Sequence, residues 1–167
     1  MNLEPVEKIN LGWLKFQRNR PEIMNYCRQP YLLSMGDQEA WLERCKDRSV
    51  IPLIVKDDNS DSCGYVSLSG FDWVSRCAEF SIFIIPEFQK MGIGPKAMRL
   101  LLDYGFNTLG LQKIHGECFD YNLRGIKFFQ DIGFKTTGKL VRHYFKNGKL
   151  IDAVIISILV EDYREAY

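Results

Sequence analysis

Short apolar runs separated by turn residues recur along this chain, a pattern typical of β-strands. Apolar runs lie on both sides of the turn cluster Asp57-Asp58-Asn59-Ser60-Asp61-Ser62, which predicts two strands joined by a turn. The dipeptide Asn147-Gly148, a strong short signal for a hairpin, separates the last two runs. The pattern as a whole predicts strands at residues 50–56, 63–69, 78–85, 113–119, 141–146 and 151–159.

Between these strands, apolar positions three or four residues apart predict helices. Ser34 or Asp37 can cap the first of them, and Pro21 suits the first turn of an earlier, shorter helix. Asn122 and Gly133 suit the N-cap and the left-handed stop of the last helix. The predicted helices lie around residues 40–45, at 95–106 and at 122–132.

The connections between these elements predict the fold class. Hairpins join most neighbouring strands, which indicates a mixed, mostly antiparallel α/β (α+β) sheet with helices on both faces. The strand at 78–85, the helix at 95–106 and the strand at 113–119 form one βαβ unit, so those two strands should be parallel. No repeat or linker interrupts the chain, and we expect residues 1–167 to form a single domain.

Composition narrows the class of protein. A formal net charge of +1 over 167 residues, with no basic stripe, argues against a nucleic-acid partner. The acidic start and the short apolar runs predict neither a signal peptide nor a membrane span, so we expect a cytoplasmic protein with no membrane partner. Five scattered cysteines and two distant histidines predict no disulfide framework and no metal site.

The segment Gln89-Lys90-Met91-Gly92-Ile93-Gly94 joins a predicted strand to a predicted helix. Backbone N–H groups and the helix dipole in such a loop favour a phosphate-bearing cofactor. Gly92-x-Gly94-x-x-Ala97 fits the dinucleotide fingerprint, and Glu117 lies roughly twenty residues further on, where an acid that binds ribose is expected. Pro86, which closes the strand well before the first glycine, argues against this dinucleotide interpretation.

The same loop resembles the coenzyme A loop of the GNAT superfamily of N-acetyltransferases, Gln/Arg-x-x-Gly-x-Gly/Ala. The segment from Ala78 to Gln89 is similar to the central strand of that family, and Asn122-Leu123-Arg124-Gly125-Ile126-Lys127-Phe128-Phe129-Gln130-Asp131-Ile132-Gly133-Phe134 is similar to its later motif. Within the superfamily, the chain resembles most the spermidine and ribosomal-protein N-terminal acetyltransferases. Its segment 18–23 also resembles enzymes that acetylate nucleotide-linked aminosugars.

The resemblance implies that acetyl-CoA is the cosubstrate, with no metal. It implies that the loop amides from Gln89 to Gly94 hold the pyrophosphate, and that backbone groups near Phe83, Ile84 and Ile85 hold the pantetheine arm. Asn122 would bond to the pantetheine, and Phe129 would pack against it. Pro95 departs from the family, because it offers no N–H to the phosphates.

For catalysis, the resemblance implies direct attack by an amine in a ternary complex. Glu79 lies where many members keep a glutamate that takes the amine proton, and Glu117, which should share a face with His115, is the second candidate for the base. Many members donate a proton from a tyrosine at the position of Phe129, which cannot do so. Tyr144, Tyr121 or water are then the candidate acids.

Two alternatives stay open from the sequence alone: a non-catalytic acyl-CoA-binding regulatory module on the same fold, and an NAD(P)-dependent oxidoreductase. The acceptor can be a polyamine, an aminosugar, another small amine or a protein N-terminus, and a homodimer is compatible with the resemblance. Trp13, Trp41 and Trp73 are candidates for lining an acceptor pocket, although large aromatic residues are more often part of the core. No acidic cluster marks a spermidine site.

Overall fold

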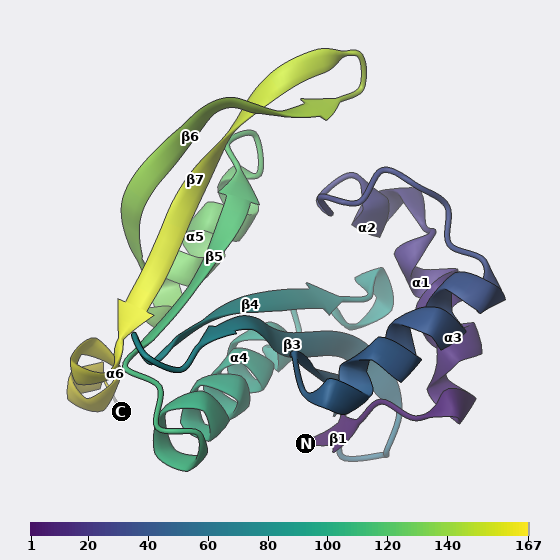
Figure 1. The fold of residues 1–167 in the computed structure, drawn as a ribbon, viewed down its shortest axis with the longest axis horizontal. Helices are drawn as coiled ribbons and strands as arrows, with labels where there is room; N and C mark the ends of the chain where they lie inside the picture. The colour runs from purple at the N-terminus through teal and green to yellow at the C-terminus, as the bar shows by residue number, and fades with distance from the viewer. Residues whose placement is uncertain (167) are drawn as a thin grey trace. The chain divides into compact units, whose positions relative to one another are not determined.

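A computed structural model describes residues 1–166 and contains a seven-stranded mixed sheet with helices around it (Figure 1). The strand order is β1-β2-β3-β4-β5-β7-β6. Strands β4 and β5 run parallel, whereas β1–β2, β2–β3, β5–β7 and β6–β7 are antiparallel pairs. The predicted fold class and the single parallel βαβ unit are therefore confirmed. The strands are β1 (Asn2–Pro5), β2 (Val50–Lys56), β3 (Ser62–Asp72), β4 (Cys77–Ile84), β5 (Lys113–Phe119), β6 (Lys135–Lys146) and β7 (Lys149–Leu159).

The helices predicted around residues 40–45, at 95–106 and at 122–132 are present, and the short helix expected at Pro21 begins there. The helices are α1 (Leu11–Arg18), α2 (Pro21–Met24), α3 (Met35–Arg44), α4 (Ile93–Asp103), α5 (Leu123–Ile132) and α6 (Val160–Ala166). A π-helical turn at Tyr104–Thr108 follows α4. No helix in the described part of the chain is long and apolar enough to span a membrane.

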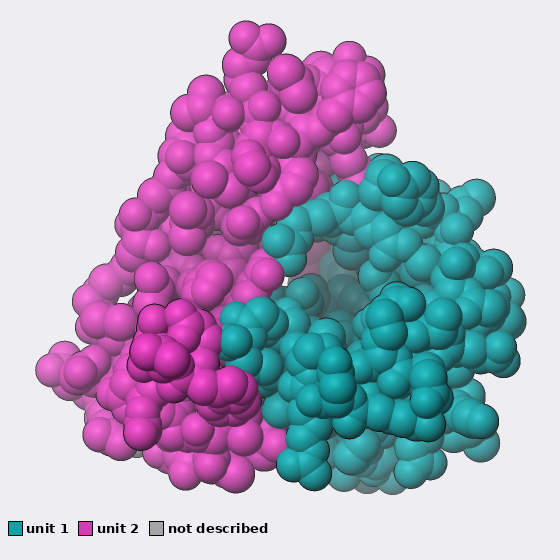
Figure 2. All heavy atoms as spheres, viewed as in Figure 1, with its two compact units in different colours: residues 1–71, 80–101 teal, residues 72–79, 102–167 magenta. Residues whose placement is uncertain are grey.

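The chain divides into two compact units, which Figure 2 shows in teal and magenta. Unit 1 comprises residues 1–71 and 80–101, and unit 2 comprises residues 72–79 and 102–167. The division falls within β4, so that Glu79 belongs to unit 2 and the end of β4 belongs to unit 1.

Helices α1 and α3 of unit 1 pack on one face of its strands. Leu11 and Leu14 of α1 are buried with Ile54 of β2 and Tyr65 of β3. Trp41 of α3 packs against the same cluster, as do Trp13 and Phe83. Ring contacts continue this packing, since Tyr65 stacks on Phe83 with centroids 5.6 Å apart. This cluster fixes the end of β4, from which the glycine loop departs.

Unit 2 is built on β5 and the long β6–β7 hairpin. β5 pairs along its whole length with the second part of β7, from Lys113↔Leu159 to Phe119↔Ala153. The hairpin turns at Asn147 and Gly148, whose φ angles of 50° and 80° are those of the predicted tight turn. Phe119, Ile151 and Ala153 form a small buried cluster where β5 and the hairpin meet.

Four elements differ from the sequence prediction. Helix α6 was not predicted, because the predicted elements ended with the strand at 151–159. Strand β1 was not predicted, because an acidic edge strand that ends at Pro5 lacks the alternating pattern of apolar and polar residues. It is extended because its backbone pairs with β2. Strand β6 begins at Lys135, six residues before the predicted start, since its first residues are mostly exposed and polar. Helix α4 begins at Ile93, two residues before Pro95, and its α-helical part ends at Asp103.

Candidate active site

The end of β4 turns into the glycine loop through one 3-10 turn at Pro86–Phe88. The side chain of Gln89 donates from Nε2 to the carbonyl oxygen of Ile84 at 2.8 Å, and its backbone N–H donates to Pro86 at 3.2 Å. Gln89 therefore stabilises the bend with both its side chain and its backbone N–H. This arrangement leaves residues 90–94 as the part of the loop best suited to phosphate.

Lys90 and Gly92 both adopt left-handed conformations, with φ angles of 64° and 76°. A Cβ built on Gly92 would meet no atom within 4 Å, so open space lies beside this backbone. The loop leads directly into α4, whose first N–H groups have no acceptor inside the helix. Alternating backbone conformations, a cationic side chain and a helix N-terminus together suit an anionic pyrophosphate. The residues present thus fit the phosphate end of coenzyme A.

The last residues of β4 are closely backed by β3. The amide of Ile85 donates to the carbonyl of Cys63 at 2.9 Å, and a Cβ on Gly64 would lie 2.4 Å from the carbonyl oxygen of Phe83. Glycine at position 64 therefore permits the close approach of the two strands. The Ile85 N–H and the Ile84 carbonyl are bonded within the protein. Pantetheine binding at Phe83, Ile84 and Ile85 stays a prediction.

An ion pair that was not predicted from the motifs braces the turn before the glycine loop. Arg20 donates from Nη1 to Glu87 at 2.7 Å and to the buried Gln17 at 3.1 Å. The two residues before Arg20 hold a different segment: Arg18 donates to Gln29 at 2.8 Å, and the Asn19 side chain both donates to and accepts from the Leu33 backbone. The end of α1 therefore anchors both the glycine loop and the segment 25–34. The sequence signalled neither contact, because the partners lie far apart along the chain.

Unit 2 gathers the predicted acid–base residues on one face of its strands. The parallel register places Glu79 beside His115, and Glu117 shares a face with His115 because side chains alternate along a strand. The hydroxyl of Tyr144 donates to a carboxylate oxygen of Glu117. Two residues that the sequence suggested separately, a base and an acid, are therefore hydrogen-bonded partners.

Aromatic packing holds Tyr144 in place. Its ring lies edge-on to Phe119 with centroids 5.3 Å apart, and His143 packs edge-on to it at 4.8 Å. The other candidate acid, Tyr121, is 44% exposed and packs against Phe119 at 5.4 Å. Tyr144 is half-buried and bonded to a carboxylate, and the role of either tyrosine as the acid stays a prediction.

Asn122 is the N-cap of α5, as predicted, and its Oδ1 accepts from the N–H of Gly125 at 3.0 Å. A Cβ on Gly125 would lie 2.4 Å from Nδ2 of Asn122, so glycine leaves room for this cap. Phe129 is buried, with its ring edge-on to Phe128 and Phe134. Capping by Asn122 is confirmed, whereas contact of Asn122 and Phe129 with the coenzyme stays a prediction.

A buried cysteine, the possible metal ligands and the three tryptophans are the remaining residues to place. Burial raises the pKa of the Cys118 thiol to about 11, which keeps it protonated at neutral pH. No cluster of metal-binding side chains occurs within residues 1–166. Trp73 is 58% exposed, whereas Trp13 and Trp41 pack on the core cluster of unit 1.

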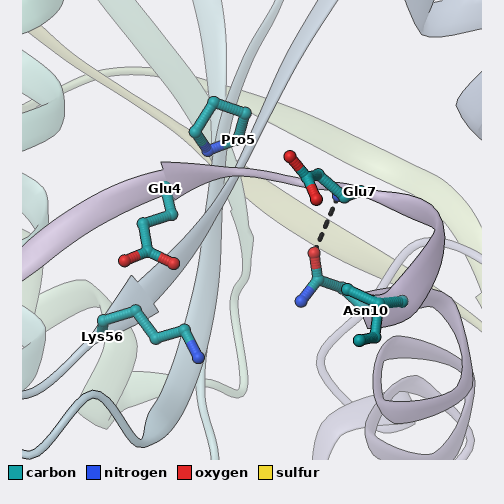
Figure 3. A pocket seen from close by; sticks show the side chains of 6 residues that line it. Glu4, Pro5, Glu7, Asn10 and Lys56 are labelled. Atoms are coloured by element: carbon teal, nitrogen blue, oxygen red, sulfur yellow. Dashed lines mark hydrogen bonds between the residues drawn. The ribbon is translucent and has the colours of Figure 1, made fainter.

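A hollow of about 500 Å³ beside β1 is lined by charged and polar residues (Figure 3). Glu4, Glu7 and Lys56 face it, and the Glu7 backbone donates to the Asn10 side chain at 2.8 Å. Both carboxylate-bearing residues are exposed, so their charges are solvated. This hollow lacks the enclosed polar groups of a catalytic centre.

Comparisons with known proteins agree with these features. Residues 1–135 match the family described as "Acetyltransferase (GNAT) domain". The chain is 29% identical over 164 residues to the spermidine N(1)-acetyltransferase of Escherichia coli (strain K12), covering 98% of this chain and 88% of that protein.

Solved structures are similar as well. The crystal structure of spermidine N-acetyltransferase from Vibrio cholerae in complex with CoA and spermine matches with a TM-score of 0.92 and 29% identity, covering 98% of this chain and 97% of that one. A complex of the enzyme from the same organism with manganese ions matches with a TM-score of 0.85 and 28% identity, covering 99% and 95% of the two chains. The chain thus belongs to the GNAT family and is an acetyl-CoA-dependent N-acetyltransferase.

Proposed function

We propose that this enzyme acetylates a primary amine of a polyamine, with Glu79 as the group that takes the amine proton. The observation that carries the proposal is the row of Glu79, His115, Glu117 and Tyr144 on one face of the unit 2 strands. Two carboxylates on one face attract a substrate that carries several ammonium groups. The spermidine acetyltransferases, which align with 98% of this chain, support the same class of acceptor.

The amine must lose a proton before it can attack, because an ammonium group has no lone pair. Glu117 already accepts a hydrogen bond from Tyr144, so one of its carboxylate oxygens is engaged within the protein. Glu79 lies one strand away, on β4, and is half-buried. The two carboxylates therefore have different tasks: Glu117 orients Tyr144 and attracts the cation, and Glu79 is the base.

Acetyl-CoA, when bound, supplies the thioester that the amine attacks. The Tyr144 hydroxyl is the candidate proton donor for the departing thiolate, since Phe129 has no proton to give. Its single proton would leave the hydrogen bond to Glu117 and pass to the sulfur, and water would then return a proton to the phenolate. Lys90 and the amides of residues 90–94 would hold the phosphates. Under this proposal no residue of the chain forms a covalent bond with the acetyl group.

A panel of amines assayed for thiol release from acetyl-CoA tests the acceptor. Spermidine and spermine should be turned over with a kcat/KM at least tenfold above an aminosugar nucleotide, an amino acid and a peptide N-terminus. Preference for the peptide would refute the polyamine proposal and point to protein N-termini. Binding of acetyl-CoA without turnover of any amine in this panel would refute the polyamine proposal as well.

The role of Glu79 is tested separately with Glu79→Gln. Loss of a general base should lower kcat/KM by about 10²–10⁴ at pH 7, with little change in acetyl-CoA affinity. The loss should shrink only toward pH 10, where an alkyl amine with a pKa of about 10 is already neutral. Glu39→Gln, an exposed carboxylate in α3, is the matched control and should leave kcat/KM unchanged. Wild-type rates for Glu79→Gln at pH 7 would exclude Glu79 as the base.

A further inference from the structure

A pocket of about 440 Å³ lies in unit 1 between α3 and the segment 29–33. We refer to it as the α3 pocket, and its lining includes Arg18, Tyr31, Leu32, Gln38, Trp41 and Arg44. None of its lining residues belongs to the glycine loop or to the acid–base row of unit 2. The catalytic assignments above therefore leave this pocket without a role.

Gln38 is the unusual residue of the α3 pocket. Its side chain is 1% exposed, and neither amide atom has a hydrogen-bond partner within residues 1–166. Proteins rarely bury a polar group without a partner, because the group loses its hydrogen bonds to water. A ligand that offers both an acceptor and a donor to this amide removes the penalty.

The charged residues around the pocket favour a ligand with a negative charge. Arg18 and Arg44 both line it, and only Asp37 opposes them. The Asp37 carboxylate accepts from the backbone N–H and the hydroxyl of Ser34, at 2.8 and 2.7 Å, and so is engaged at the start of α3. Arg18 donates from Nη2 to Gln29 at 2.8 Å, which uses one of the five N–H donors of a guanidinium. This balance favours an anionic group, most simply a carboxylate or a phosphate.

The walls of the pocket are aromatic and apolar. Trp41 is half-buried and lies edge-on to Tyr65, with ring centroids 6.2 Å apart. Tyr31 and Leu32 are 73% and 71% exposed, so little packing opposes the movement that gives a ligand access to the buried amide. A pocket of this size and polarity resembles small-molecule sites, which combine apolar walls with a few polar groups.

We propose that the α3 pocket binds a small organic anion that carries an amide-like donor and acceptor beside its carboxylate or phosphate. The anion would contact Arg18 and Arg44, and its donor–acceptor pair would complete the hydrogen bonds of Gln38. This pocket shares no lining residue with the residues assigned to acetyl transfer, and the proposal does not depend on which amine the enzyme acetylates.

N-Acetylglycine is a suitable probe, since it joins a carboxylate to an amide. Acetamide and inorganic phosphate are the matched partial probes, each with half of this chemistry. Titration calorimetry should show N-acetylglycine binding at least tenfold tighter than either partial probe. In NMR spectra it should shift the side-chain NH₂ signals of Gln38 and the indole signal of Trp41. No shift at Gln38, or equal affinity for all three probes, would overturn the proposal.

Variants separate a binding role from a structural one. Gln38→Leu should raise the melting temperature, because it removes a buried amide without partners, and should weaken N-acetylglycine binding at least tenfold. Arg44→Gln should weaken binding similarly with an unchanged melting temperature, and it provides the test if Gln38→Leu does not fold. Arg164→Gln in α6, an exposed arginine outside the pocket, should leave binding unchanged. A destabilised Gln38→Leu that still binds the probe would refute the assignment.

Discussion

Gly64 offers a sharp test of how β3 supports the predicted coenzyme strand. We expect Gly64→Ala to destabilise the protein and to weaken acetyl-CoA binding. The φ angle of Gly64 is not positive, so the backbone conformation itself accepts alanine. The cost therefore comes entirely from the volume of the added methyl group.

The structure shows how close the added methyl group would lie to its neighbours. The new Cβ would lie 2.4 Å from the Phe83 carbonyl oxygen, 2.7 Å from Cδ1 of Ile84 and 3.1 Å from its Cα. Ordinary contact distances are about 3.5 Å or more, so the backbone of β4 must move by roughly 1 Å. The Ile84 methyl group can rotate away, but the carbonyl oxygen cannot. Overpacking of this kind costs about 1–3 kcal/mol, or roughly 3–10 °C in Tm for a chain of this size.

Urea unfolding followed by circular dichroism measures the stability, and calorimetric titration with acetyl-CoA measures the affinity. Gly12→Ala in α1 is the matched control, because a Cβ there meets nothing within 4 Å. That change should stabilise the protein by up to about 1 kcal/mol, the helix preference of alanine over glycine. If Gly64→Ala is as stable as the wild type, the close approach of β3 and β4 does not constrain the fold. If it is destabilised but binds acetyl-CoA normally, the end of β4 does not hold the coenzyme.

The remaining predictions concern the loop, the missing acid and the brace. Gly92→Asp adds a negative charge at a left-handed position and should weaken acetyl-CoA binding at least tenfold, about 1.4 kcal/mol or more, in a protein that circular dichroism finds folded; unchanged affinity would remove the loop from the cofactor site. Phe129→Tyr should retain or raise kcat in the thiol-release assay if the ring lies near the thioester, whereas loss of folding would show that Phe129 serves only the core. The pKa of Glu87 is lowered from 4.5 by its own backbone N–H and by Arg20, so its stabilising charge is present at and above pH 4.5 and is lost as the pH falls below that value. The difference in urea midpoint between wild type and Glu87→Gln should therefore stay constant from pH 7 to 5 and shrink only below pH 4.5, and a difference that vanishes by pH 6 would contradict this assignment.

Features encoded by local chemistry could be predicted from the sequence. Asn122 caps α5 and Gly133 ends it with a φ of 108°, because both roles depend on a few neighbouring residues. The turn at Asn147 and Gly148 is predictable for the same reason. Strand β1 is different: Asn2 becomes part of a strand only through pairing with Lys56, and no local pattern reports such a partner.

In the candidate site, too, the local features could be predicted from the sequence and the long-range contacts could not. The glycine loop is visible as a motif, since consecutive residues supply its geometry. The bond between Tyr144 and Glu117 depends on the registers of β5, β6 and β7, which bring together residues 27 positions apart. The contact of Arg20 with Glu87 spans 67 positions and has no sequence signature. Contacts between side chains that lie far apart in the sequence could therefore be identified only from the structure.

The anchor at Asn19 has a consequence for how this enzyme can diversify. Asn19 bonds to the backbone N–H and carbonyl of Leu33, at 2.8 and 2.9 Å, and not to its side chain. Every residue except proline offers these two groups, so position 33 can change its side chain while the anchor persists. The segment before it can thus vary in sequence, as antibody loops do on a constant framework, while its end stays fixed to α1. Libraries that randomise residues 30–33 and keep Asn19 should consequently yield folded enzymes with altered ligand preferences.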